Sequence, residues 1–361
     1  MDIRNEYHVL GVMSGTSLDG LDLAMVKFTR ERIESPWAFE LSSARTIGYP
    51  EEVRQKLANA IHWSDQDREI LSRDLGIYIG EQINDFLEEV RVPDFIASHG
   101  HTILHQPEKQ LTLQIGDGEQ IWKVTGIPVI NNFREADVLA GGQGAPLVPI
   151  GDRDLFSDYH YALNLGGIAN ISYDEGGKRV AFDICPFNMA LNDLAEELKL
   201  PYDDGGKLAQ AGELDQTLLE QLNQINYLNQ KAPKSLGLED YLEYWRPKLK
   251  KNKKSTEDKL RTFVEHAAAQ IAECINSKGD VKILVTGGGA YNQFFLERLT
   301  NFTQAQVLVP DNRIVDFKEA LVFAYLGLLK LEGKPNCLAS VTGAPHDISG
   351  GNFHGFGTDY Q

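Results

Sequence analysis

The sequence predicts an α/β protein of two domains in which one order of strands and helices occurs twice. At 361 residues the chain is too long for a single ordinary core. Strand-like segments alternate with segments of helical periodicity, and each half opens with three strand-like segments, the first two joined by a glycine turn. Because this order recurs about 150 residues later, we expect a duplication, with residues 1–150 as the first domain and 151–361 as the second.

The first domain is expected to open with strands and to continue with helices. Alternating apolar residues predict strands at 8–14, 21–28 and 37–46. Apolar residues at helical spacing predict helices at 51–62 and 65–90. Two short strands, 94–98 and 128–133, precede an irregular glycine- and proline-rich loop at 140–149.

The second domain is expected to repeat this order around a polar helical insertion at about 201–255. Its predicted strands are 161–165, 168–173, 179–184, 281–286 and 306–309. Its predicted helices are 188–198, 256–276, 292–300 and 317–331.

Composition restricts the class of partner. The net charge of −17 would repel a nucleic-acid backbone, and the one basic run, 246–254, is typical of a solvated loop or helix end, with a binding patch as the alternative. No apolar run approaches the roughly 20 residues of a membrane span, and the first residues lack the apolar core of a signal peptide. Three widely separated cysteines indicate a reducing compartment. We therefore expect a cytoplasmic protein that binds a small molecule, with no nucleic acid and no membrane.

Three glycine turns together predict a nucleotide site. Gly15 and Gly20 enclose Ser14, Thr16, Ser17 and Asp19, a second turn is Asn164-Leu165-Gly166-Gly167, and a third is Gly287-Gly288-Gly289. Glycines let backbone N–H groups approach a phosphate, and a helix start after a strand favours anions. Each turn alone could be an ordinary loop. If the first two face one another across a cleft, they could hold one polyphosphate from both sides.

Two carboxylates are the candidates for chemistry at such a site. Asp183 interrupts an apolar strand, so it is the candidate general base; the alternative is a cap of the following helix, for which Asn188 is better placed. Asp19 lies beside the expected phosphates, where an acid normally requires a divalent cation between them. We therefore expect ATP with Mg²⁺, and Asp19 as the metal-organising residue.

Polar residues that could hold an acceptor follow two strands of the first domain. His99 and Thr102 follow residues 94–98, and Arg134 and Asp137 follow 128–133. Arg134 could pair with a substrate carboxylate or, equally, with Glu135 or Asp137 at the surface. Glu319 opens an apolar helix, where an acid usually pairs with the helix dipole and less often binds a ligand.

Four stretches spread over the chain resemble those of the anhydro-N-acetylmuramic acid kinase family. They are 11–20 (GVMSGTSLDG), 98–102 (SHGHT), 140–149 (AGGQGAPLVP) and 164–170 (NLGGIAN). The resemblance implies the duplicated ribonuclease-H-like architecture of actin, heat-shock chaperone ATPases and sugar kinases, with an interdomain nucleotide cleft. It places the first domain on the sugar side and the second on the nucleotide side, and it implies a homodimer.

The resemblance also implies a double reaction that belongs to cell-wall sugar recycling. ATP phosphorylates O6 of a 1,6-anhydro sugar while water opens the anhydro bridge, giving N-acetylmuramic acid 6-phosphate and ADP. Asp183 would activate the water, Arg134 would bind the lactyl carboxylate or a neighbouring group, and Glu319 would lie on the acceptor side. The phosphates would be bound by Gly15, Thr16, Ser17, Leu18, Asp19, Gly20, Leu21 and Asp22.

This chain departs from the family pattern at two motifs. The stretch after Asp183 is Ile184-Cys185-Pro186-Phe187-Asn188 where the family has a glycine-rich sequence, and His101 stands where glutamine is frequent. Lys234 keeps part of a Lys-Ser-Thr-Gly pattern without an assigned task. Two alternatives stay open: a kinase of another sugar or acid, and an actin-like or chaperone-like binding module switched by ATP.

Overall fold

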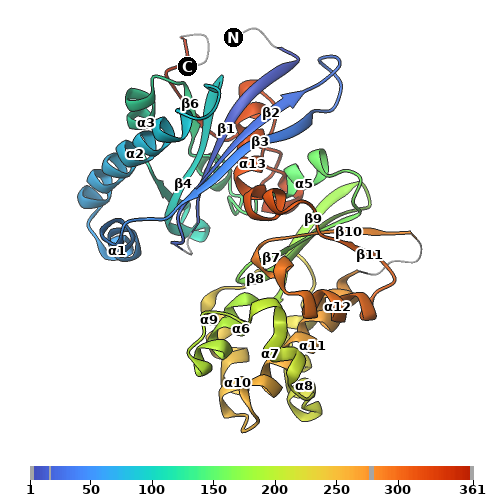
Figure 1. Ribbon diagram of the computed structural model, residues 1–361. Coiled ribbons are helices and arrows are strands. Elements are labelled where there is room, and N and C mark those ends of the chain that lie inside the picture. The colour runs from blue at the N-terminus through green and yellow to red at the C-terminus, as the bar shows by residue number, and fades with distance from the viewer. Residues whose placement is uncertain (1–3, 16–17, 276–279, 358–361) are drawn as a thin grey trace. The chain divides into compact units, whose positions relative to one another are not determined.

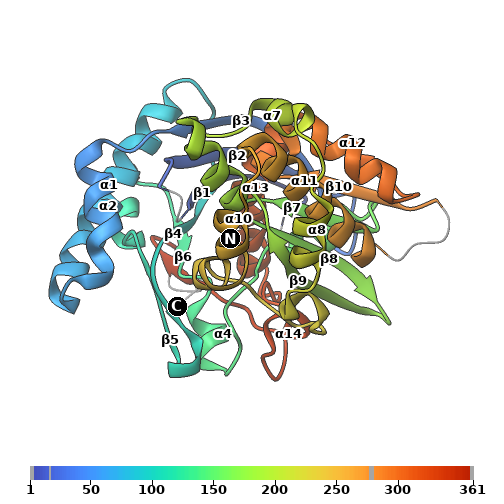
Figure 2. The same ribbon diagram turned by 90° about the horizontal axis from the view of Figure 1, so that it is seen from below.

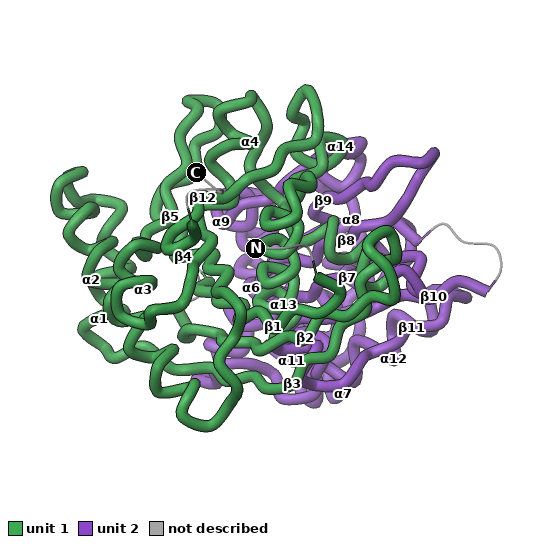
Figure 3. Tube along the Cα trace, turned by 90° about the horizontal axis from the view of Figure 1, so that it is seen from above, with its two compact units in different colours: residues 1–156, 317–361 green, residues 157–316 purple. Residues whose placement is uncertain are grey.

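The chain forms two compact units. A computed structural model describes residues 4–15, 18–275 and 280–357. Unit 1 comprises residues 1–156 and 317–361, and unit 2 comprises residues 157–316 (Figure 3). The first stretch of unit 1 ends at residue 156, where a boundary at 150 was expected. Residues 317–361, expected in the second domain, belong to unit 1.

Unit 1 contains a mixed sheet in the order β12-β6-β4-β1-β2-β3, with β5 paired to β4 (Figure 1). The strands are β1 (Glu6–Ser14), β2 (Leu21–Thr29), β3 (Ala38–Ile47), β4 (Phe95–Gln106), β5 (Leu111–Ile115), β6 (Val129–Asn131) and β12 (Asn352–His354). β1, β2 and β3 form an antiparallel meander, whereas β4 runs parallel to β1 and β6 runs parallel to β4.

Helices on one face of this sheet cover the side chains that the central strands direct toward that face. Leu10 and Val12 of β1 lie in the same apolar cluster as Leu75 and Ile79 of α2 (Asp65–Leu87). α2 begins after Ser64, whose side chain accepts a hydrogen bond from Asp67 N and satisfies one otherwise unpaired helix donor. The other helices of unit 1 outside α13 are α1 (Glu51–Asn59), α3 (Gly118–Thr125), α4 (Glu135–Leu139), α5 (Pro149–Leu155) and α14 (Ala339–Thr342).

Small residues place α13 (Asn312–Leu331) on the opposite face of the sheet. A Cβ added to Gly11 of β1 would collide with the carbonyl oxygen of Ala320. A Cβ added to Gly327 would lie 2.7 Å from the Cβ of Ala97 on β4. The helix backbone therefore approaches the strands closely. This contact, together with the antiparallel pairing of β12 with β6, joins the C-terminal segment to unit 1.

Unit 2 repeats the strand order of unit 1. Its sheet runs β11-β10-β7-β8-β9, with β7, β8 and β9 in an antiparallel meander, β10 parallel to β7, and β11 parallel to β10. The strands are β7 (Tyr161–Leu165), β8 (Ile168–Glu175), β9 (Lys178–Pro186), β10 (Lys282–Thr286) and β11 (Gln306–Leu308). When the additional strands β5 and β12 of unit 1 are set aside, β6-β4-β1-β2-β3 corresponds strand for strand to β11-β10-β7-β8-β9, which confirms the duplication and the two-domain ribonuclease-H-like fold class.

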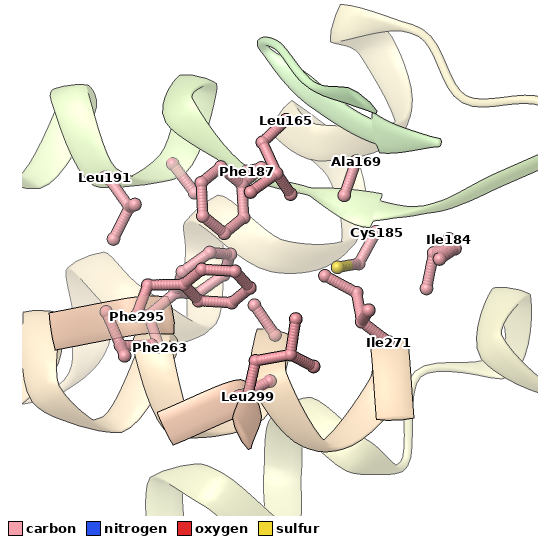
Figure 4. Packing of buried hydrophobic residues seen from close by; sticks show 14 of the residues in the cluster. Leu165, Ala169, Ile184, Cys185, Phe187, Leu191, Phe263, Ile271, Phe295 and Leu299 are labelled. Carbon is pink, nitrogen blue, oxygen red and sulfur yellow. The ribbon is translucent and has the colours of Figure 1, made fainter. Parts of the chain in front are cut away.

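The core of unit 2 joins this sheet to a group of helices. Phe187 and Phe295 meet edge to face with ring centroids 4.6 Å apart, and Phe263 of α11 (Thr256–Cys274) belongs to the same cluster (Figure 4). α11 packs against α7, α8 and α12 (Figure 2). Besides α11, unit 2 contains the helices α6 (Asn188–Ala195), α7 (Lys207–Ala211), α8 (Gln216–Asn223), α9 (Leu238–Asp240), α10 (Arg246–Lys251) and α12 (Gln293–Phe302).

The segment predicted as a polar insertion is helical, with α7 to α10 inside it. The basic run forms α10 and its end. Arg246 and Lys250 make ion pairs with Asp193, and Lys250 also pairs with Glu197. The solvated helix end expected from the sequence therefore describes this run.

Candidate active site

The hairpin between β1 and β2 carries the first glycine turn. Thr16 and Ser17 lie outside the described residues, while Leu18 N donates to Gly15 O at 3.2 Å to close a turn. A Cβ on Gly20 would lie 2.5 Å from the carbonyl oxygen of Ile47, so only glycine fits there. Asp19 is exposed at the tip. The hairpin thus presents backbone and a carboxylate to solvent.

Leu21 and Asp22 follow the hairpin at the start of β2. Leu21 is fully buried in the core of unit 1 and cannot contact a ligand with its side chain. Asp22 is half-buried, and its Oδ1 accepts a 2.5 Å hydrogen bond from Thr46 Oγ1 of β3. Asp22 is therefore held in place by its neighbouring strand.

A buried hydrogen-bond chain fixes the start of the hairpin. Tyr49 OH donates to Ser14 Oγ at 2.6 Å, so the hydroxyl of Ser14 is left to donate to His101 Nδ1 at 2.9 Å. Burial lowers the pKa of His101 to about 4, so the ring is neutral near pH 7. His101 therefore acts as an acceptor that orients Ser14, a contact that no sequence signal identified.

The segment 99–102 lies within β4 and not after a strand, which corrects the sequence prediction. β4 continues because residues from His101 onward pair with β5. Gly100, at φ 73°, allows the irregularity, and a Cβ there would lie 2.5 Å from the carbonyl oxygen of Ile115. Thr102 is half-buried, and its Oγ1 accepts a 3.4 Å hydrogen bond from Gln114.

Arg134 forms a hydrogen-bonded pair with His99 and does not pair with Glu135 or Asp137. Its Nε donates to His99 Nε2 at 3.0 Å, and its Nη1 donates to Gly144 O at 2.7 Å. His99 Nδ1 lies 2.9 Å from Gly100 O, so the ring donates from Nδ1 and accepts at Nε2. Burial and the charge of Arg134 hold the pKa of His99 well below its ordinary value. His99 therefore orients the guanidinium as a neutral ring.

Asp137 supports the loop 140–149 from inside. It is fully buried, with Oδ2 accepting from Gly144 N at 2.7 Å and Oδ1 accepting from Thr342 Oγ1 at 2.8 Å. Both carboxylate oxygens are thus used within unit 1. The loop that also supplies the carbonyl acceptor for Arg134 is held by this residue.

Glu319 lies beyond the first turn of α13, because that helix begins at Asn312 and not at residue 317. A role as dipole partner at a helix start is therefore wrong. The side chain of Glu319 reaches solvent, yet the atoms around its carboxyl group remove part of its hydration and so raise its pKa. The positive charges of Arg134 and Lys318 lower the pKa and partly offset this rise. Asp22 raises the pKa of Glu319 further through like charge. Unit 1 thus places one carboxylate, one guanidinium and one ammonium within electrostatic range of Glu319.

A buried ion pair fixes the turn that carries Glu319. Lys318 Nζ lies 2.6 Å from Asp152 Oδ1, and both side chains are about 5% exposed. Asp152 belongs to α5, so α5 and α13 are joined immediately beside Glu319.

The two glycine turns of unit 2 lie side by side. Asn164 and Thr286 are paired at the ends of the parallel strands β7 and β10. Gly287 has φ 81°, and a Cβ there would lie 2.6 Å from Asn164 Oδ1. Glycine is therefore required at Gly287 both for its backbone conformation and for space.

The carbonyls of Gly166 and Gly167 cap the start of α6. Phe187 N donates to Gly167 O at 2.8 Å, and Asn188 N donates to Gly166 O at 3.1 Å. After the third turn, Gly288 begins a short 3₁₀ helix, and a Cβ on Gly289 would lie 2.6 Å from the Cβ of Leu165. Both turns are thus packed at one end of the unit 2 sheet.

Asp183 is a half-buried carboxylate of β9, near the same end of this sheet. It lies three residues before Pro186, which pairs with Ile168 directly after the Gly166-Gly167 turn. Its Oδ2 accepts a 2.8 Å hydrogen bond from Leu236 N, and Oδ1 has no hydrogen-bond partner among the described residues. Burial raises the pKa of Asp183 to about 6, and the Leu236 N–H opposes this rise. Such a group is a suitable base near neutral pH.

The alternative role for Asp183 as a helix cap is wrong. The residue that precedes the first turn of α6 is Phe187, with no side-chain cap. Asn188, the expected cap, instead donates its amide to Leu165 O at 3.1 Å.

A metal site built only from protein side chains is absent from the described residues. Across residues 4–15, 18–275 and 280–357, no group of three or more His, Cys, Asp or Glu could hold a metal ion. Mg²⁺ usually takes one or two carboxylates and completes its shell with phosphate oxygens and water. The exposed Asp19 and the half-buried Asp22 are hard oxygen donors that fit such partial coordination.

Comparison with known proteins decides the family. The family model described as anhydro-N-acetylmuramic acid kinase matches residues 7–354. The chain belongs to this family.

Curated relatives of this family can be aligned with the chain over nearly their whole length. An anhydro-N-acetylmuramic acid kinase from Mannheimia succiniciproducens is 34% identical over 96% of this chain and 98% of its own. One from Paramagnetospirillum magneticum is 35% identical, over 96% and 99% respectively. Among solved structures, a xylulose kinase from Lactobacillus acidophilus overlaps with a TM-score of 0.45 at 11% identity, covering 89% of each chain. The fold assignment rests on the two strand orders and not on that overlap.

Two contacts of this family member were not identified from the sequence. Leu236 N and Tyr227 OH both reach Asp183, the latter donating to its carbonyl oxygen at 2.8 Å. Both residues lie in the polar insertion, more than 40 positions from Asp183. The incomplete Lys-Ser-Thr-Gly pattern at Lys234 was the one available signal.

Within the described parts of the chain, no helix combines the length and apolar character needed to cross a bilayer.

Proposed function

We propose that the protein is an ATP-dependent anhydro-N-acetylmuramic acid kinase. It opens the 1,6-anhydro ring with water and phosphorylates O6, giving N-acetylmuramic acid 6-phosphate and ADP. Membership of the family over residues 7–354 supports the reaction. The observation that carries the mechanism is Asp183, a half-buried carboxylate with one oxygen held by Leu236 N–H and a pKa near 6.

Asp183 is the general base of the proposed reaction. Its carboxylate accepts a proton from water as the water oxygen forms a bond to the anomeric carbon. The bond between that carbon and O6 breaks, and O6 attacks the γ-phosphorus of ATP. The bond from the γ-phosphorus to the β,γ-bridging oxygen then breaks, and ADP leaves with that oxygen.

The glycine turns bind the phosphates in this proposal. Backbone N–H groups in the ranges 15–22, 166–167 and 287–289 would supply donors, apart from Leu18 N and Gly287 N, which donate to Gly15 O and Val315 O. Asn164 would add the amide nitrogen that lies beside Gly166. Mg²⁺, when bound, neutralises phosphate charge, and Asp19 with Asp22 would hold it.

The sugar is held by residues of unit 1. Arg134, oriented by His99, presents a guanidinium for the lactyl carboxylate, because a fixed guanidinium binds carboxylates well. Glu319 lies within electrostatic range of Arg134 and would accept a hydrogen bond from the acceptor side of the sugar. Thr102 is a candidate donor to the sugar. Asp137 has a positioning role, since both of its oxygens are used by the loop 140–149.

Neither alternative function is favoured. The relatives that match this chain over nearly its full length are named anhydro-N-acetylmuramic acid kinases. This likeness supports the anhydro-sugar reaction over a kinase of another sugar or acid and over an ATP-switched binding module. We infer a cytoplasmic location, because the reaction consumes ATP and the three cysteines are free thiols. A homodimer stays a prediction of the family resemblance, which sedimentation would test.

A coupled assay for ADP tests the substrate. ADP release should require 1,6-anhydro-N-acetylmuramic acid and should stay at background with N-acetylmuramic acid or N-acetylglucosamine. Omission of Mg²⁺ should abolish it. Equal rates with a reducing sugar would contradict the proposal and favour an ordinary sugar kinase.

A further inference from the structure

Asp183 makes three hydrogen bonds to one segment of the polar insertion, residues 227–236. Tyr227 OH donates to the carbonyl oxygen of Asp183 at 2.8 Å, and Leu236 N donates to its Oδ2 at 2.8 Å. The amide of Asp183 itself donates to Lys234 O at 3.2 Å. The backbone and the carboxylate of the proposed base are thus fixed by the same segment, which lies outside the duplicated sheet.

The ammonium of Lys234 closes this segment into a loop. Lys234 Nζ donates to the carbonyl oxygens of Tyr227 at 3.3 Å and Leu228 at 3.2 Å. It also lies 4.6 Å from the ring centroid of Tyr227 and 5.7 Å from that of Phe182, the residue before Asp183. One side chain therefore joins the end of the loop that donates Tyr227 OH to the end that donates Leu236 N–H.

These contacts explain how the ammonium group of Lys234 can be partly buried. Burial lowers the pKa of Lys234, and a half-buried ammonium is tolerated only with acceptors around it. Two carbonyl oxygens and two aromatic faces supply them. The shift in the pKa of Asp183 comes from burial and from Leu236 N–H, so Lys234 acts on Asp183 through geometry.

We propose that Lys234 is a positioning residue for Asp183, holding the loop 227–236 so that Tyr227 and Leu236 keep the carboxylate in place. The mechanistic part rests on the proposed function, because it takes Asp183 as the base. Without the ammonium the two ends of the loop separate, and Leu236 N–H no longer stabilises the ionised carboxylate. The pKa of Asp183 then rises, and a larger fraction of the enzyme is protonated and inactive at a given pH.

Few other titratable groups face this cluster. Tyr227 faces both Asp183 and Asp240, and Cys185 of β9 lies near Tyr227 and Lys234. From α11, Cys274 and Glu273 raise the pKa of Lys234. Burial raises the pKa of each of the two thiols, so neither thiol changes charge near pH 6, where Asp183 titrates.

Lys234→Met tests the proposal, because methionine keeps most of the length and removes the charge. The acid limb of the kcat/KM profile should move up by about one pH unit, the size expected when a carboxylate loses one charge-assisted hydrogen bond. kcat at pH 6 should fall while KM for ATP stays within about twofold. Lys234→Arg should restore most of the activity. Lys231→Met, at an exposed lysine of the same loop, is the matched control and should leave the profile unchanged.

Carbon-13 NMR of the Asp183 carboxyl in the whole protein separates this proposal from the proposed function. It should report the same upward shift in Lys234→Met even if the anhydro sugar is not the substrate. If Lys234→Met does not fold, Tyr227→Phe tests the same loop and should move the titration in the same direction. A purely structural role predicts an unchanged acid limb and an unchanged Asp183 titration. That result in the folded variant would overturn the proposal.

Discussion

At the scale of single residues, the proposed chemistry depends on Asp183 remaining a weak acid in a fixed position. Burial raises its pKa to about 6, and one hydrogen bond from Leu236 N–H limits the rise. A carboxylate with this pKa is ionised near neutral pH yet basic enough to accept a proton from water. The position of this Asp in an apolar strand was visible in the sequence, whereas its hydrogen-bond partners were not.

Asp183→Asn should abolish turnover while both substrates still bind. Loss of a general base normally costs about 10²–10⁴-fold in rate. The protein should remain as stable as the wild type at pH 8, because a neutral isostere removes the cost of a partly buried negative charge and its oxygen can still accept from Leu236 N. Activity within about tenfold of the wild type would contradict the assignment.

The rate should depend on pH through the same group. Because the base acts when ionised and its pKa is raised to about 6, kcat/KM should rise with pH through about 6 and level off above it. Below that value it should fall about tenfold per pH unit. A profile that stays flat down to pH 4.5 would show that another group is the base.

Arg134→Gln tests the sugar-binding role. Removing one charge-assisted contact to a carboxylate should raise KM for the anhydro sugar by roughly 10- to 100-fold and leave KM for ATP nearly unchanged. Arg54→Gln, at an exposed arginine paired with Glu51 on α1, is the control and should match the wild type. Equal KM values for the two variants would mean that Arg134 only supports the loop at Gly144.

At the scale of elements, the glycine turns depend on close packing between neighbouring strands. Gly287 has a positive φ and no room for a Cβ beside Asn164, whereas Gly126, at the end of α3, has a positive φ and open space. A side chain at Gly126 would face moderate strain, because φ 70° and ψ 3° lie close to the left-handed helical region, whereas φ 81° and ψ 167° at Gly287 belong to a region that essentially only glycine adopts. Only Gly287 lies at the expected phosphate site.

Gly287→Ala and Gly126→Ala are compared because both strain the backbone, but only Gly287 lies at the expected phosphate site. Gly126→Ala should destabilise by about 1 kcal/mol without changing KM for ATP. Gly287→Ala should destabilise further and lower kcat/KM for ATP by about 100-fold, because displacing the turn misplaces the phosphates. Unfolding curves and ATP titrations measure the two effects. Equal kinetics for the pair would remove the third turn from the site.

Most elements could be predicted because their signals are local. The strands from β1 to β3 and from β7 to β9 follow alternating apolar residues, and α2 and α11 follow helical spacing. β4 was predicted too short, because its continuation depends on pairing with β5 across the irregularity at Gly100. Such pairing is a property of the sheet and not of the strand's own sequence.

The site could be predicted in part for a similar reason. Glycine turns and Asp183 are visible locally, but the hydrogen bonds from Tyr227 and Leu236 to Asp183 bridge more than 40 residues. The hydrogen bond from Arg134 to the ring of His99 has no local signal in the sequence, and a contact of His99 with substrate stays a prediction. The hydrogen bonds that Asp137 accepts from Gly144 N and Thr342 Oγ1 likewise have no local signal, and a contact of Asp137 with the ligand stays a prediction.

At the scale of the whole molecule, duplication explains how the groups for this reaction are distributed. Each unit has the same strand order and a glycine turn between its first two strands. Unit 1 contains Arg134 and Glu319, which we propose to bind the sugar, and unit 2 contains Asp183, the proposed base. The C-terminal segment belongs to unit 1 because Gly11 and Gly327 allow α13 to approach the sheet, which length and periodicity alone do not indicate.

The central claim is that water attacks the anomeric carbon while O6 receives the phosphoryl group. Turnover of ATP and 1,6-anhydro-N-acetylmuramic acid in water enriched in heavy oxygen, followed by mass analysis of the product, tests this directly. Unlabelled product held in the same water for the same time measures exchange. We predict one heavy oxygen at the anomeric carbon and none in the phosphate group. A phosphorylated product with an unlabelled anomeric oxygen would contradict the account.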